Sequence, residues 1–104
     1  MSSLSNIWYS GTMIHRYLTK LKEIVEVNRV QTGVRLEKRL LKMLKAVAEL
    51  KDMSLGDLLE GIVLHAFEGK SAFSPRTLKE IEQLRSIYRM ALHASNSHKL
   101  KEAK

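Results

Sequence analysis

Residues 29–67, RVQTGVRLEKRLLKMLKAVAELKDMSLGDLLEGIVLHAF, pass from one hydrophobic period to another, and this change decides the expected fold. From Arg29 to Leu36 apolar and polar residues alternate, which is the pattern of a strand. From Glu37 apolar residues recur every three or four positions, which predicts a helix, a stop near Lys51 and a second helix. A lone strand leaves its backbone N–H and C=O groups unpaired, so the pattern predicts that a second copy supplies the partner strand.

The alternation over residues 29–36 sorts the side chains into two rows. The inward row is apolar or β-branched and is expected to build the dimer: Val30, Thr32, Val34 and Leu36. The outward row is basic, amide or glycine: Arg29, Gln31, Gly33 and Arg35. Arginine and glutamine present paired hydrogen-bonding groups that suit base edges in the DNA major groove. The outward row is therefore predicted to contact bases, with Gly33 offering only its backbone.

Helix-start signals place the elements around this stretch. Ser54, followed three residues later by Asp57, predicts a capped helix that ends at Gly69. Ser74 and Pro75 predict a further helix whose apolar spacing continues to Leu92. Another helix is expected from residue 12 to about residue 27, and residues 95–104 are expected to form a frayed basic tail. The predicted organisation is an arm and helix over 1–28, a core over 29–69, and a helix and tail over 70–104.

Length and composition restrict the class of protein. A chain of 104 residues with 44% hydrophobic residues is one domain, or a small domain with appendages, and is too short to bury a large core alone. It has no cysteine, which excludes disulfides and thiolate metal sites and suits the cytoplasm. No apolar run approaches the roughly 20 residues that span a bilayer, and no signal-peptide pattern is present. We therefore expect a cytoplasmic protein with no membrane segment.

Positive charge gathers on the predicted strand and the helix after it. The net charge of +7 divides into +5 over residues 29–51, −3 over residues 52–73, +4 from residue 74 onward and +1 over the first 28 residues. A polyanion-binding face needs such a cluster, although a solvated basic face has the same composition.

Catalytic and metal-binding patterns are missing from the sequence. The four histidines are scattered, and the spacing of His93 and His98 does not place them on one helical face. There is no glycine-rich phosphate loop and no activated-serine motif. We therefore expect neither an enzyme nor a bound metal or cofactor.

The order strand, helix, serine-capped turn and helix resembles the ribbon-helix-helix family of Arc and methionine repressors. The resemblance covers residues 29–69 and includes V-x-L at Val34–Leu36 and L-x-x-x-L-x-x-x-A at Leu40–Ala48. It implies a mainly α homodimer in which two strands form an intermolecular antiparallel ribbon that enters the major groove, here with extra N- and C-terminal helices. Base contacts would then fall on Gln31, Gly33 and Arg35.

The same resemblance places phosphate contacts at the start of the second helix, at Ser54, Leu55 and Gly56. Unpaired helix-start N–H groups also form an anion site on physical grounds. Lys38 is a further candidate phosphate contact, and Arg29 lies at the margin of the strand. Together these residues predict a sequence-specific, double-stranded-DNA-binding homodimer that regulates transcription.

Two alternatives stay open at this point. The same dimeric fold could serve as an antitoxin-like or adaptor module that binds a second protein through its flanking helices. A helix-turn-helix could instead use residues 37–68, completed by the first helix, but it would leave the alternation at residues 30–36 unexplained.

Overall fold

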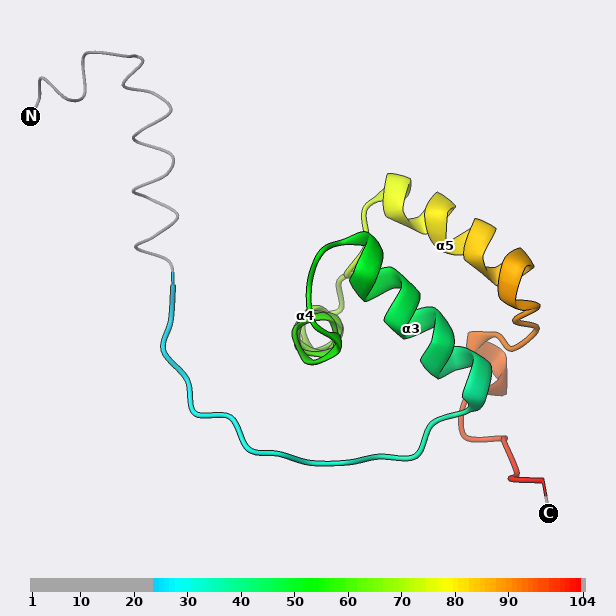
Figure 1. Ribbon diagram of the computed structural model, residues 1–104, viewed down its shortest axis with the longest axis horizontal. Helices are drawn as coiled ribbons and strands as arrows, with labels where there is room; N and C mark the ends of the chain where they lie inside the picture. The colour runs from blue at the N-terminus through cyan, green and yellow to red at the C-terminus, as the bar shows by residue number, and fades with distance from the viewer. Residues whose placement is uncertain (1–23, 104) are drawn as a thin grey trace, which may run out of the picture. The chain divides into compact units, whose positions relative to one another are not determined.

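A computed structural model of the chain describes residues 24–103. The chain divides into two units, residues 1–33 and residues 34–104. Within the first unit, residues 24–33 are described and have no regular secondary structure. The second unit contains α3 (Lys38–Leu50), α4 (Leu55–Phe67), α5 (Pro75–Tyr88) and a short 3-10 helix, η1 (Ala94–Asn96) (Figure 1).

The ribbon predicted from residues 29–36 is wrong. No residue between 24 and 103 is in a strand, and Val30 and Val34 of the expected inward row are 86% and 73% exposed. The alternation of apolar and polar residues indicates which side chains could share one face of a strand. A strand also needs a second strand to pair its backbone groups. The described part of the chain offers none, so the segment is an extended connection and the ribbon-helix-helix architecture is not observed. The expectation of a mainly α chain is confirmed.

The helix predicted over residues 12–27 lies mostly outside the described residues. Its last four positions, residues 24–27, have no helical structure.

Helix α3 begins and ends close to the predicted positions. The Glu37 side chain accepts a hydrogen bond of 2.8 Å from the backbone N–H of Leu40, which satisfies a free donor of the first turn. The helix ends at Leu50, after which Asp52 adopts a left-handed conformation at φ 55°. Its buried side chains are Met43, Val47 and Ala48.

Helix α4 follows after a short turn and has the predicted cap. The Ser54 hydroxyl accepts a hydrogen bond of 3.1 Å from the backbone N–H of Asp57. Leu58 is the one buried residue of α4. The helix ends before Gly69, whose φ of +70° is the left-handed conformation that glycine adopts most easily.

Helix α5 starts as predicted, with Ser74 as cap and Pro75 at its first position, but it ends at Tyr88 and not near Leu92. Arg89 is left-handed at φ 53° and turns the chain. Lys51 after α3 pairs with Glu80 at 3.2 Å, while Arg39 at the other end of α3 donates to the carbonyl of Arg89 at 3.3 Å. These two contacts show that α5 runs antiparallel to α3. In Figure 1, α4 is seen almost end-on beside α3, so its axis runs in a different direction from those of α3 and α5.

The core lies where the three helices meet. Val47, Ala48 and Leu58 form its centre, and five partly buried side chains pack against them: Leu44, Ile62, Phe73, Ile81 and Leu84. No described side chain of the core is completely buried, so the core is small for a chain of this length.

The first residues after α5 pack on the helices. Met90 is buried, and the Arg85 side chain donates to the carbonyls of Met90 and Leu92 at 3.3 and 2.8 Å. None of the described helices is both long and apolar enough to cross a membrane.

Candidate nucleic-acid interface

Three lysines form a row along the outer face of α3. Lys38, Lys42 and Lys45 are exposed and follow a spacing of four and three, so they lie on one side of the helix, opposite the buried Met43 and Val47. At about 1.5 Å per residue the row is roughly 10 Å long. Among the ion pairs of the described residues, none uses any of these three ammonium groups. The lysine row is therefore available to an external anion.

A groove continues the basic surface at the start of α3. It has a volume of about 730 Å³ and lies between the first residues of α3 and the end of the chain. Four cationic and two anionic side chains line it: Arg35, Lys38, Arg39, Lys101, Glu37 and Glu102. The groove therefore has a positive balance and joins the lysine row at Lys38.

Arg35 is paired within this groove. Its guanidinium contacts the carboxylate of Glu102, and the two side chains are 84% and 71% exposed. Ion pairs that are this exposed contribute little to stability because water screens them. A phosphate oxygen can therefore replace Glu102 as the partner of Arg35 at small cost.

The predicted phosphate site at the start of α4 is remote from Lys38. Ser54, Leu55 and Gly56 follow the C-terminal end of α3, whereas Lys38 begins that helix. The 13 residues of α3 separate them by about 20 Å. Asp57 stands in the first turn of α4 and disfavours an anion there. The structure therefore does not bring these two sets of phosphate contacts together.

The remaining predicted base contacts belong to the first unit. Gln31 and Gly33 are exposed, and a Cβ built on Gly33 would meet no atom within 4 Å. Arg29 lies in the same extended segment. The roles of these three residues at DNA bases stay predictions.

Two basic residues of the groove were not among the predicted site residues. Arg39 and Lys101 line the groove beside Arg35 and Lys38 although they are far apart in the chain. The charge cluster at residues 29–51 contained Arg39, but nothing in the sequence indicated that Lys101 returns to it. Between residues 24 and 103, no three acidic or histidine side chains lie close enough together to hold a metal ion.

Glu37 fixes the helix start at the edge of the groove, and this role depends on pH. Hydrogen bonds from the amides of Leu40 and then Arg39 lower the pKa of the Glu37 carboxyl below its ordinary value of 4.5. The charged carboxylate therefore stabilises the fold fully above about pH 4.5, and this contribution is lost as the pH falls through the lowered pKa.

We expect Glu37→Gln to be less stable than the wild type near pH 6, and the difference in free energy of unfolding to shrink toward pH 3. Urea unfolding at each pH measures it. Glu49→Gln makes the same charge change on α3 away from its start. Its difference from the wild type in free energy of unfolding should be smaller and should vary less with pH. If the difference in free energy of unfolding between Glu37→Gln and the wild type stays constant from pH 6 to pH 3, the charged Glu37 side chain does not cap α3.

Comparisons with protein-family models, curated proteins and solved structures gave no match to this chain.

Proposed function

We propose that the chain binds double-stranded DNA through the basic side of α3, as a cytoplasmic transcriptional regulator and not as an enzyme. The lysine row carries this proposal: three exposed ammonium groups on the helix face opposite the core, with no carboxylate partner among the described residues. Lysines so placed neutralise phosphates and release counterions, the sequence-independent part of DNA affinity. Arg35, at one end of the row, is the side chain best suited to a base edge.

The dimensions of α3 favour DNA over duplex RNA. A helix with side chains is about 10–12 Å wide, and the major groove of B-DNA, about 12 Å wide, admits it. The major groove of A-form RNA is deep and narrow. The lysine row, roughly 10 Å long, matches the axial length of about three base pairs.

A salt series with a lysine variant tests this function. Replacing Lys38, Lys42 and Lys45 together by glutamine should reduce the slope of log affinity against log salt by about 2.7 per protomer, because each phosphate contact contributes about 0.9. Fluorescence anisotropy with a labelled DNA duplex measures both slopes. The same measurement on duplex RNA should give weaker binding.

A matched triple variant distinguishes the effect of the lysine row on DNA affinity from the effect of total charge. Changing Lys70, Arg76 and Lys79 to glutamine removes the same three charges from other exposed positions of the second unit. This control variant should keep most of the wild-type slope of log affinity against log salt. Equal losses in the two triple variants would mean that affinity follows total charge, and the proposed α3 interface would then be wrong.

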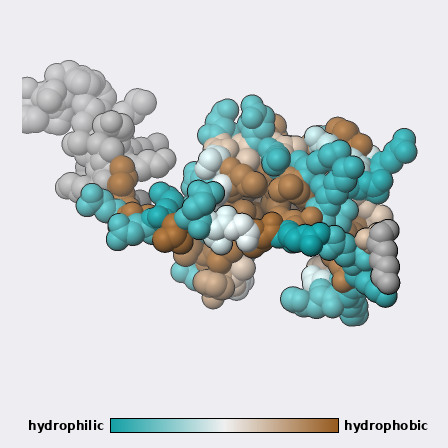
Figure 2. All heavy atoms as spheres, turned by 60° about the horizontal axis from the view of Figure 1, so that its bottom comes forward, coloured by the Kyte–Doolittle hydropathy of each residue, from teal (hydrophilic) through white to brown (hydrophobic). Residues whose placement is uncertain are grey.

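We also propose that the protein is a homodimer, on the evidence of α4. The backbone of this helix comes close to that of α3 but not to that of α5. Three of its large apolar side chains are exposed: Val63 by 43%, Leu64 by 65% and Phe67 by 83%. Figure 2 shows hydrophobic residues on the exposed surface of the second unit. Isolated surface leucines are common, but several on one helix mark a protein contact.

Two observations favour a second copy as the occupant of this α4 face. Among residues 24–103 only five hydrophobic residues are buried, too few for robust stability, so the fold gains from a partner. A second copy is present wherever the chain is present, and its binding to the folded chain adds stability. Residues 54–69 contain three acidic residues and no lysine or arginine, whereas the whole chain carries +7. The acidic residues therefore keep DNA away from this face, which leaves it to a protein partner.

A further inference from the structure

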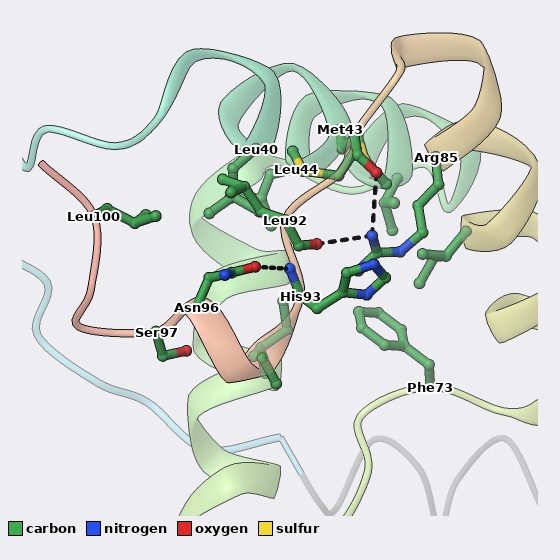
Figure 3. Close-up of a pocket in the computed structure, with 15 residues that line it drawn as sticks. Leu40, Met43, Leu44, Phe73, Arg85, Leu92, His93, Asn96, Ser97 and Leu100 are labelled. Carbon is green, nitrogen blue, oxygen red and sulfur yellow. Dashed lines mark hydrogen bonds between the residues drawn. The ribbon is translucent and has the colours of Figure 1, made fainter. Parts of the chain in front are cut away.

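An apolar cavity lies between α3, α5 and the chain segment 90–100 (Figure 3). Its volume is about 320 Å³. At about 30 Å³ for each water-sized group, it has room for roughly ten non-hydrogen atoms. Apart from Arg85, the side chains that the helices and the chain before α5 contribute to its wall are apolar and include Leu40, Met43, Leu44, Ile62, Phe73 and Ile81. A cavity of this size and composition suits a small organic molecule.

Arg85 places a positive charge at the wall of this cavity. Its Nη1 donates to the carbonyls of Met90 and Leu92, which fixes the guanidinium against the segment after α5. Its Nε is 3.9 Å from Glu82 Oε2, too far for a hydrogen bond. Among the described residues, Nη2 has no hydrogen-bond partner. The guanidinium therefore keeps free donors for an anion.

The surroundings of Arg85 strengthen its attraction for an anion. Its side chain is only 26% exposed, so solvent screens the charge less than at an open surface. His93 and Asn96 line the cavity from the segment after α5, where the backbone N–H of His93 donates to Asn96 Oδ1 at 2.8 Å (Figure 3). The polar lining groups thus come from Arg85 and from the segment after α5, and the rest of the lining is aliphatic or aromatic. A ligand that fits must have an anionic head and an apolar body.

We propose that this cavity binds a small carboxylic acid with an apolar chain, its carboxylate on Arg85 and its chain against Leu44 and Phe73. The site does not depend on DNA binding, and its test contains no DNA, so each proposal can fail without the other.

Sodium octanoate, with ten non-hydrogen atoms, and the neutral 1-octanol are the probes. We expect octanoate to shift the NMR methyl signals of Met43 and Met90 with a Kd on the order of 0.1–1 mM, as small ligands allow. Octanol should bind at least about tenfold more weakly, because it lacks the charge that pairs with the guanidinium. Absence of any saturable shift with octanoate, or equal affinity for the two probes, overturns the proposal.

Two variants locate the site. Arg85→Gln keeps a donor for one backbone carbonyl but removes the charge, so it should bring octanoate to the affinity of octanol and leave octanol within about twofold. Arg76→Gln, at an exposed position of the same helix, is its control and should change neither. Ala94→Phe fills the cavity from an exposed position on η1 and should abolish binding of both probes. Undiminished octanoate binding in Ala94→Phe would also overturn the proposal, even if Arg85→Gln failed to fold.

Discussion

Replacing Leu58 by alanine is expected to lower the free energy of unfolding by about 2–5 kcal/mol. Leu58 is 5% exposed and is the only side chain of α4 that is buried, against Val47 and Ala48 of α3. Removing it deletes the most deeply buried contact of α4 and leaves a cavity that the surrounding side chains can fill only in part. Since small domains have a total stability of about 5–15 kcal/mol, a large part of the variant should be unfolded in moderate urea.

Urea unfolding followed by circular dichroism measures this loss, with all proteins at one concentration so that association does not change between samples. Leu78→Ala is the matched control, because Leu78 is 47% exposed on α5 and its truncation should cost about 1 kcal/mol or less. If Leu58→Ala and Leu78→Ala lose the same stability, Leu58 is not at the centre of the core.

Helix starts were predictable because capping is local chemistry. Ser54 and Ser74 accept hydrogen bonds from the backbone three residues ahead, and the residues that make this contact are neighbours in the sequence. Glu37 does the same for α3. The end of α5 was mispredicted because the left-handed turn falls on Arg89, a residue that gives no stop signal, while apolar spacing continues beyond it.

The strand prediction for residues 29–36 was wrong for a different reason. Its alternation is real in the sequence, but a strand is a property of two segments, and no periodicity within one segment states that the other exists. The candidate site could be predicted only in part for the same reason, because some of its residues come together only in the folded chain. Lys38 and Arg35 are close in sequence and were predicted together, whereas Lys101 reaches the groove only because the chain after α5 returns to the start of α3.

Replacing Phe67 by glutamate is expected to raise the dissociation constant of the proposed homodimer by about 10²-fold or more. Phe67 is 83% exposed in the single chain, so it contributes little to the fold of one copy. Its burial in an interface would contribute roughly 2 kcal/mol, and an unpaired carboxylate at the same place would add a desolvation cost. At 1.4 kcal/mol for each tenfold change in affinity, the two effects together exceed two decades. Sedimentation equilibrium over a range of protein concentrations measures the change.

Ile87→Glu supplies the comparison, because Ile87 is 71% exposed on α5 and the same charge is introduced outside α4. It should change the dissociation constant by less than about threefold. The thermal midpoint adds a second criterion: when dimerisation stabilises the fold, the midpoint of the wild type and of Ile87→Glu rises with protein concentration, and that of Phe67→Glu does not. A wild type that remains monomeric at 100 µM, with a midpoint independent of concentration, would mean that α4 is covered by something other than a second copy. A dimer that Ile87→Glu separates and Phe67→Glu leaves intact would place the interface on α5.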